Sequence, residues 1–166
     1  MKEIYHRRSV RKYKDEIIPL EIVKEFIKAG MNAPSANNVM PWQFIIINDK
    51  TILSQITKFH PYANMLNYSS GAILVCGDRS IQNDDGYLVL DCSAATENIL
   101  LEIDSQGFGA VWLGIYPNMD RMSAISDLIK LPETVLPITL ISYGVPMDEL
   151  KSNNKYFEDR IRVNRW

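Results

Sequence analysis

Residues 84–106 read DDGYLVLDCSAATENILLEIDSQ and form the longest helical pattern in the chain. Apolar side chains recur there at three- and four-residue spacing, which predicts one continuous helix rather than a strand. Gly107 follows directly and favours the left-handed conformation that ends many helices. Because the segment is apolar on most of its surface, we expect a central helix that other elements cover. Its innermost stripe consists of Leu88, Cys92, Ala95, Ile99 and Ile103.

Four apolar runs on either side of this helix predict the strands of one sheet, at residues 43–47, 72–77, 110–115 and 138–144. Continuous apolar sequence without alternation indicates strands that are covered on both faces. Helical patterns at residues 19–30, 51–59 and 120–131 supply that cover, the last with Asp120 as its expected N-cap. We therefore expect residues 1–166 to form one domain with three layers, helix, sheet and helix. The strand order does not follow from these patterns.

The composition excludes several classes of protein. A hydrophobic content of 46% and a charged content of 23% are ordinary for a soluble domain. The formal net charge of -2 argues against a nucleic-acid binder, and no apolar run approaches the roughly 20 residues that span a bilayer. Two Cys and two His are too few for a structural zinc site, so we expect no metal. The basic N-terminus lacks the apolar stretch of a secretory signal, and we expect a cytoplasmic protein.

The motifs of several common enzyme classes are absent. Residues 107–109 (GFG) are followed by Trp112 where a dinucleotide-binding loop needs a third glycine, and they follow a helix instead of a strand. No Gly-x-Ser-x-Gly occurs, so the nucleophile elbow of many hydrolases is missing. His6 and His60 have no Cys or carboxylate partner at a recognisable spacing. The sequence therefore gives little support to a hydrolase.

Cationic residues concentrate at the two ends of the chain. Residues 1–14 hold six of the 18 Lys and Arg, and residues 151–166 hold five. Both ends contain closely spaced arginines, in RRSVR at residues 7–11 and RIR at residues 160–162. An arginine side chain suits a phosphate because it donates two parallel hydrogen bonds. Apolar residues interleave the cations, unlike in most solvated tails. The pattern favours one anionic ligand held by both ends, with two solvated charged termini as the alternative.

In combination, three segments resemble the nitroreductase family of FMN-dependent flavoproteins. They are RRSVRKY at residues 7–13, PSANNVMPW at residues 34–42 and GFGAVWLG at residues 107–114. The ending, from residue 156 to Trp166, is similar to that of short family members. Each segment alone is weak evidence for the family, but the ordered set is specific and spans nearly the whole chain. The resemblance implies an α+β fold with α/β/α layers, a mixed central sheet, and a homodimer with a domain-swapped C-terminal arm and two FMN molecules at its interface.

The resemblance also implies an oxidoreductase. Such an enzyme takes a hydride from NADH or NADPH onto flavin N5 and passes reducing equivalents, by a ping-pong mechanism, to a small-molecule electron acceptor. The acceptor could be a nitroaromatic, a quinone or a flavin-like molecule, and a specialised dehalogenase or flavin-fragmenting enzyme is a rival. Two other classes stay open: an FMN-binding store or sensor with little turnover, and a domain whose basic arms bind polyanions.

By family position, the arginines at the two ends would hold the FMN phosphate. Arg7 and Ser9 would bind the phosphate and ribityl end, and Arg8 would contribute to the same pocket. Arg160 and Arg162 would close over the phosphate from the C-terminal arm. Alternate residues of an extended segment face the same side, so both of these arginines could reach one ligand.

The ring of the flavin would meet other residues. Arg11 would lie at the pyrimidine edge, where two-electron reduction leaves negative charge near N1 and O2 and a cation favours the reduced form. No side chain is expected to act as a catalytic acid, base or nucleophile, because the chemistry takes place on flavin N5. The remaining contacts that the resemblance implies are Pro34, Ser35 and Ala36 against the ring from the partner subunit, Asn38 from the same loop, and backbone groups of Leu113 and Gly114 near N5.

Three positions depart from the common family pattern. Met40 stands where Gln is frequent, Asn64 lies where longer members often have a Lys, and Arg162 replaces a frequent His. Arg11 is therefore expected to be the main cation near N1. The short stretch between residues 62 and 72 offers little material for a lid, so we expect a cleft that is open on one side.

Overall fold

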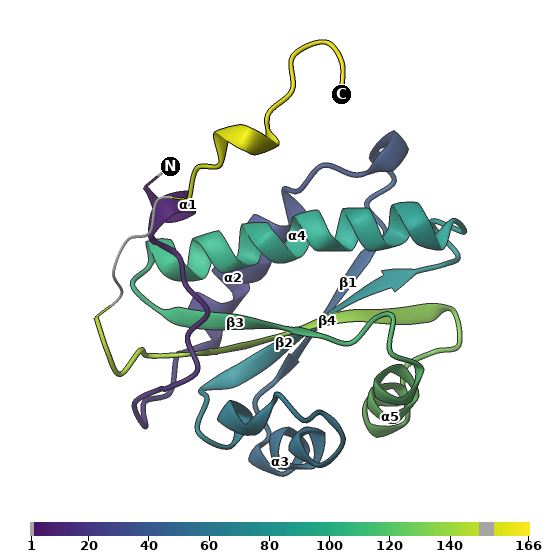
Figure 1. Ribbon diagram of the computed structural model, residues 1–166. Helices are drawn as coiled ribbons and strands as arrows, with labels where there is room; N and C mark the ends of the chain where they lie inside the picture. Colours follow the sequence, from purple (N-terminus) through teal and green to yellow (C-terminus); the bar gives the residue numbers. More distant parts are fainter. Residues whose placement is uncertain (1, 150–154) are drawn as a thin grey trace.

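The computed structural model describes residues 2–149 and 155–166 and shows a four-stranded sheet between two layers of helices (Figure 1). The strands are β1 (Trp42–Ile47), β2 (Gly71–Asp78), β3 (Gly109–Gly114) and β4 (Val135–Gly144), in the order β1-β2-β4-β3. Every neighbouring pair of these strands is antiparallel. Strands β1 and β3 are therefore the two edges of this sheet.

Helices α2 and α4 cover one face of the sheet, and α3 and α5 cover the other (Figure 1). The α-helices of the described residues are α1 (Glu3–His6), α2 (Leu20–Met31), α3 (Lys50–Phe59), α4 (Asp85–Ser105) and α5 (Met119–Ile129). Short 3-10 helices are η1 (Ala36–Asn38), η2 (Asn64–Asn67) and η3 (Glu158–Arg160). The predicted three-layer α+β fold is confirmed.

Two details of the fold differ from the expectation. Asn118 rather than Asp120 caps α5, because the Asn118 side chain accepts a hydrogen bond of 2.9 Å from the backbone N–H of Arg121. The sheet was expected to be mixed, but all of its neighbouring strands are antiparallel. In the described part of the chain, parallel pairing is limited to a bridge between Ser9 and Ala110. The continuous apolar sequence of these strands therefore reflects helices on both faces of the sheet and not parallel pairing.

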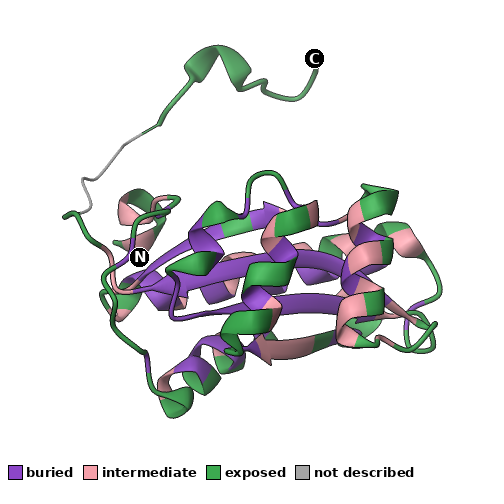
Figure 2. Ribbon diagram, turned by 90° about the horizontal axis from the view of Figure 1, so that it is seen from below, coloured by how far each residue is buried: buried purple, intermediate pink, exposed green. Residues whose placement is uncertain are grey.

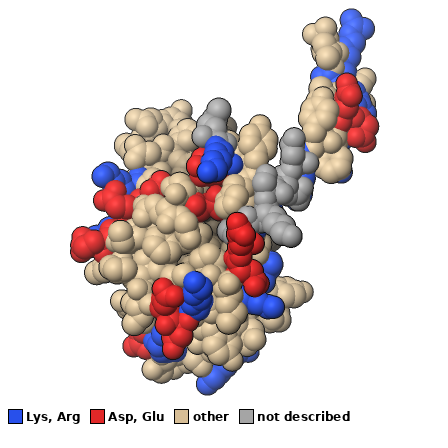
Figure 3. Space-filling view, turned by 90° about the vertical axis from the view of Figure 1, so that its left-hand side faces the viewer, with Lys and Arg blue, Asp and Glu red and all other residues tan. Residues whose placement is uncertain are grey.

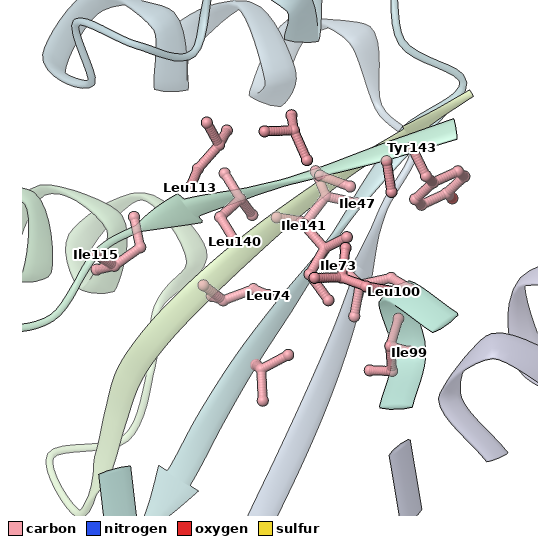
Figure 4. Close-up of a cluster of buried hydrophobic side chains, with 14 of the residues drawn as sticks. Ile47, Ile73, Leu74, Ile99, Leu100, Leu113, Ile115, Leu140, Ile141 and Tyr143 are labelled. Carbon is pink, nitrogen blue, oxygen red and sulfur yellow. The ribbon is translucent and has the colours of Figure 1, made fainter. Parts of the chain in front are cut away.

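The inner stripe of α4 forms the centre of the core, where it meets the sheet (Figure 4). All five residues of the predicted stripe are fully buried. Thr96 of the same helix lies 3.0 Å from the Thr139 hydroxyl of β4, so each buried hydroxyl has a hydrogen-bond partner. Gly107 has a φ of 80° and ends the helix as predicted. Figure 2 shows the result, a buried sheet under helices whose outer faces are exposed.

The segment before α2 lies along the open edge of β3. The Val10 N–H donates to the Ala110 carbonyl at 2.9 Å, and the Tyr13 hydroxyl donates to the Val10 carbonyl at 2.8 Å. Gly109 permits this approach, because a Cβ there would lie 2.7 Å from Val10 Cγ1. The sheet thereby holds the arginine-rich residues 7–11 at a defined place.

His6 has a carboxylate partner that the sequence spacing did not reveal. Its Nδ1 lies 2.9 Å from Oδ2 of Asp104, which is 98 residues away in the last turn of α4. The Asp104 side chain is buried, and a buried carboxylate is costly unless it is paired. The contact therefore fastens α1 to the end of α4.

Residues 155–166 extend away from the body and are exposed throughout (Figure 2). Their exposed residues include large apolar side chains: Tyr156, Phe157, Ile161, Val163 and Trp166. An exposed apolar series of this kind is typical of a segment that packs on another surface. We call residues 155–166 the C-terminal arm.

Replacing Gly109 by Ala is expected to lower the free energy of unfolding by about 1–3 kcal/mol, as overpacking usually does. The added methyl group would meet the Val10 side chain at 2.7 Å, and the Val10–Ala110 hydrogen bond prevents the two segments from moving apart freely. Chemical denaturation measures the change. Gly86→Ala, in the exposed first turn of α4, is the control: its added Cβ would lie 3.0 Å from Oδ1 of Asp84, the end of an exposed side chain that can shift, so the loss of stability should be smaller than for Gly109→Ala. Equal stability of the two variants would contradict the close packing of the N-terminal segment.

Candidate functional site

A cleft of about 480 Å³ opens between the N-terminal segment and η2. Its size is that of a pocket for a cofactor or a drug-sized molecule. The cleft brings Arg11 and Asn64 together, the two residues that the sequence associates with the pyrimidine edge of a flavin. The lining residues are Arg11, Lys12, Tyr13, Asn64, Met65, Tyr68 and Met147.

The cleft offers hydrogen-bond donors and positive charge at one end. Arg11 is exposed and forms no ion pair within residues 2–149 and 155–166. The Asn67 side-chain amide donates to Asn64 Oδ1 at 3.3 Å, which leaves the Asn64 Nδ2 group to donate elsewhere. Burial raises the pKa of Tyr13, so its hydroxyl stays protonated and donates to the backbone. The donors left for a ligand are therefore Arg11 and the Asn64 amide, which suit the electron-rich edge of a heterocycle.

The predicted phosphate-binding residues Arg7, Arg8 and Ser9 precede Arg11 on the N-terminal segment. Ser9 is exposed beside β3. Arg7 Nε donates to Glu97 Oε1 of α4 at 3.1 Å. Arg8 Nη2 donates to the Tyr5 carbonyl at 3.2 Å. The single chain thus uses part of the donor capacity of Arg7 and Arg8, and the Ser9 hydroxyl faces solvent.

The loop around η1 contains three residues in the left-handed region. Asn37, Asn38 and Met40 have φ values of 52°, 56° and 51°. Asn tolerates this conformation, but Met does not, and such strain concentrates at functional sites. The Ser35 hydroxyl accepts the Met40 N–H at 3.0 Å and helps to hold the turn.

A buried carboxylate of α4 anchors the same loop. Asp91 is only 5% exposed, and its Oδ1 accepts the Ala36 N–H at 2.9 Å. Its Oδ2 is buried and has no hydrogen-bond partner in the described part of the chain. The loop lies across the fold from η2 (Figure 1), so Pro34, Ser35, Ala36 and Asn38 do not line the cleft of Arg11 in their own chain.

Gly114, at the end of β3, holds the other end of the candidate site. Ile115 donates its N–H to the Ile138 carbonyl of β4, and hydrogen bonding alternates along an antiparallel pair. The N–H and the carbonyl of Gly114 therefore both face the open edge of the sheet, while the Leu113 side chain is buried in the core. A Cβ on Gly114 would meet nothing closer than 4.0 Å, so a ligand can approach its backbone.

Two side chains meet the Gly114 carbonyl. His60 Nε2 lies 3.1 Å from the oxygen, and Arg121 Nη1 donates to it at 3.0 Å. His60 Nδ1 accepts the Tyr62 N–H at 3.3 Å, so the proton of the neutral ring lies on Nε2, which donates to the Gly114 carbonyl. Burial lowers the pKa of His60 and favours this neutral form. Residues 60–68 thus connect Gly114 with the cleft, because Asn64 and Tyr68 line that cleft.

The C-terminal arginines do not reach the other candidate residues within one chain. Arg160 lies over the Phe157 ring, with Cζ 4.2 Å from the ring centroid. Arg162 donates to the carbonyls of Asp159 and Ile161. Arg160 belongs to η3, so the two arginines do not share a simple extended segment as expected. Both are exposed on the C-terminal arm.

Sequence reasoning did not identify Asp91, His60 or Arg121. A carboxylate within the nearly uniform apolar pattern of residues 84–106 was the available signal for Asp91, since such a residue is seldom buried without a partner. No sequence signal pointed to His60 and Arg121, whose common partner is a backbone carbonyl.

Several other kinds of site are not present among residues 2–149 and 155–166. No group of His, Cys, Asp and Glu in this part of the chain could hold a metal ion, and none of its helices is long and apolar enough to cross a membrane. Burial raises the pKa of the Cys76 and Cys92 thiols to about 12, so neither is a ready nucleophile. Figure 3 shows Lys and Arg interspersed with Asp and Glu on one face of the molecule.

Acidification should destabilise the protein through His60. Folding lowers the pKa of His60 below its usual 6.5, so the unfolded chain binds more protons and stability falls as the pH drops below 6.5. His60→Gln keeps an N–H donor for Gly114 but does not titrate. Its melting temperature should therefore change less than that of the wild type between about pH 7 and pH 5. The same pH slope in both proteins, measured by thermal denaturation, would count against a neutral His60.

Comparisons with known proteins agree with these observations. A model of the Nitroreductase family matches residues 4–75. The whole chain is 39% identical to a protein of Methanothermobacter thermautotrophicus named "Putative NADH dehydrogenase/NAD(P)H nitroreductase", and it covers 87% of that protein. A crystal structure of a protein of the same name from Parabacteroides distasonis has a TM-score of 0.95 at 40% identity, over 99% of this chain and 97% of that one.

The likeness extends to a protein whose cofactor is known. An FMN-dependent nitroreductase from Clostridium difficile R20291 has a TM-score of 0.90 at 25% identity, and the match covers 99% of each chain. The full-length identity to the archaeal relative and the conserved fold lead to one conclusion. The chain belongs to the nitroreductase family.

Proposed function

We propose that this protein is an FMN-dependent oxidoreductase that accepts a hydride from NADH or NADPH and reduces a nitroaromatic, a quinone or a similar acceptor by a ping-pong mechanism. One observation carries the proposal: the cleft at Arg11 and Asn64 is connected through residues 60–68 to the accessible backbone of Gly114. The names of the relatives, which include an NAD(P)H nitroreductase and an FMN-dependent nitroreductase, support the same activity.

The residues of the cleft fit the ring system of FMN. Aromatic and thioether side chains of Tyr68 and Met147 offer apolar contact, while Arg11 and the Asn64 amide offer donors at one end. An arginine without a carboxylate partner favours a ligand that becomes more negative on reduction. When it is bound, FMN supplies the atom that receives and returns the hydride. Arg11 would stabilise the negative charge, and the Gly114 N–H would donate to the ring near N5.

The phosphate of FMN is proposed to lie against the N-terminal segment. Ser9 is exposed there, and Arg7 is half-buried beside it. Glu97 holds Arg7 through Nε, which leaves the two terminal amino groups of the guanidinium to face an anion. Arg8 would add a second positive charge. This arrangement pre-orients Arg7 before the ligand binds, which reduces the entropic cost of binding.

A homodimer completes the proposed site. Residues 34–38 lie far from the cleft of their own chain, and the arm that carries Arg160 and Arg162 extends away from the body (Figures 1 and 2). A partner subunit could bring both groups to the cleft. The outer face of α4 also exposes Tyr87 and Leu90, and the arm exposes its apolar residues. Burying these surfaces between two protomers would stabilise the dimer.

The proposed activity is tested by mixing the FMN-loaded protein anaerobically with NADH or NADPH in a stopped-flow spectrometer. The flavin absorbance near 450 nm is expected to fall rapidly. Its rate of loss should exceed that of free FMN by about tenfold or more, because the site orients donor and acceptor. A store or sensor would hold FMN but be reduced only by dithionite. Protein that fails to bind FMN at all would contradict the proposed function.

Removing the C-terminal arm, residues 155–166, is expected to produce a monomer with strongly reduced FMN content. The arm would supply both apolar contact with the partner and cations for the phosphate. Sedimentation and flavin absorbance measure the two effects. In the control, Arg160→Ala combined with Arg162→Ala keeps the apolar residues, so it should remain dimeric and still lose FMN affinity by about tenfold or more. A truncated protein that stays dimeric and retains FMN would refute this role of the arm.

A further inference from the structure

Arg121 occupies an unusual position for a cation. It lies in the first turn of α5, where its backbone N–H is bonded to the capping Asn118. The positive end of the helix dipole makes a cation unfavourable there. In addition, no carboxylate of the described residues forms an ion pair with Arg121. Helix stability therefore does not account for this arginine.

The contacts of Arg121 hold its guanidinium in place without neutralising it. Nη1 donates to the Gly114 carbonyl at 3.0 Å, and Cζ lies 5.6 Å from the centroid of the Tyr62 ring. Both partners are uncharged, so the full positive charge remains. The residue is half-buried, which weakens the screening of that charge by water. A fixed, unneutralised guanidinium is suited to bind an anionic group.

Tyr62 provides a flat apolar surface beside this charge. Its side chain is 68% exposed, although the His60 ring packs against it edge-on, with the centroids 6.3 Å apart. Arg121 and His60 thus restrict the ring while leaving much of it open. A restricted, exposed aromatic ring is suited to stack with another planar ring. An arginine and a tyrosine in this arrangement together match an aromatic molecule that carries an anionic substituent.

The place of this pair relative to Gly114 indicates which ligand it meets. Arg121 and His60 share the Gly114 carbonyl, and the backbone of Gly114 is proposed to lie at the hydride-transfer end of the flavin. We propose that Arg121 and Tyr62 form a recognition subsite for an anionic aromatic electron acceptor, such as one with a carboxylate on its ring. This inference rests on the proposed function and names the substrate class that the same site prefers.

Two acceptors of nearly equal shape test the proposal. 4-Nitrobenzoate carries the anionic group, and 4-nitrobenzamide is its neutral counterpart with the same reacting nitro group. Wild-type holoenzyme is expected to have the higher kcat/KM for 4-nitrobenzoate. Arg121→Gln keeps a donor for the Gly114 carbonyl but removes the charge. It should lower kcat/KM for 4-nitrobenzoate about tenfold, the usual effect of losing one charge-assisted hydrogen bond, and change that for 4-nitrobenzamide about twofold or less.

Matched variants separate recognition from a merely structural effect. Arg121→Lys restores the charge and should recover most of the preference. Arg79→Gln removes an equal charge that Asp85 already neutralises, so it should leave the preference unchanged. Tyr62→Ala should lower kcat/KM for both acceptors, and Tyr62→Phe should lower it for neither, because stacking requires the ring and not the hydroxyl. Calorimetric titration with 4-nitrobenzoate gives the corresponding change in Kd without turnover.

The outcomes distinguish this inference from the proposed function. Suppose that the wild-type protein binds FMN and that NADH or NADPH reduces it, but that Arg121→Gln has the wild-type kcat/KM for both nitro compounds. The subsite is then refuted and the proposed function stands. A preference that Arg79→Gln also abolishes would refute it too, since the effect would then be one of overall charge. Protein without flavin reduction would refute the proposed function itself, and unchanged calorimetric Kd values in Arg121→Gln would then refute the subsite separately.

Discussion

The open edge of β3 organises the candidate site. Backbone groups along an edge strand alternate in direction, so Ala110 and Gly114 both face away from β4. Ala110 accepts the Val10 N–H and thereby holds the arginine-rich N-terminal segment. The Gly114 carbonyl accepts hydrogen bonds from the His60 and Arg121 side chains. At about 3.3 Å per residue, the two anchors lie roughly 13 Å apart on one rigid strand. Strand β3 alone can therefore position the protein groups that would contact the two ends of an extended planar ligand.

The distribution of ion pairs distinguishes the cations at this edge. Among the described residues, four Lys and Arg side chains form ion pairs with carboxylates: Arg7, Lys24, Lys28 and Arg79. Arg7 and Arg79 have carboxylate partners, whereas Arg11 and Arg121 have none among the described residues. Arg11 lies at the end of the edge near the cleft, and Arg121 at the end near Gly114. In the proposed enzyme, the first would act on the flavin and the second on the acceptor.

Local sequence patterns predicted much of the fold. The helix at residues 84–106 and the four apolar strands appear close to their predicted limits, because periodicity and capping depend on neighbours within a few positions. The cap of α5 was assigned to Asp120 instead of Asn118, since several residues near a helix start can serve as caps. The ordered motifs at residues 7–13 and 107–114 also indicated the family, which the full-length relatives confirm.

The sequence by itself determined the secondary structure, the buried stripe of α4 and the concentration of arginine at both ends of the chain. Only the tertiary structure decided which of those arginines are neutralised, and that His60, Arg121 and Asp91 hold the backbone at Gly114 and Ala36. It also separated residues 34–38 from the cleft of their own chain. The physical reason is range: helix and strand patterns arise between near neighbours, whereas hydrogen bonds and ion pairs act over about 3 Å between residues that only folding brings together.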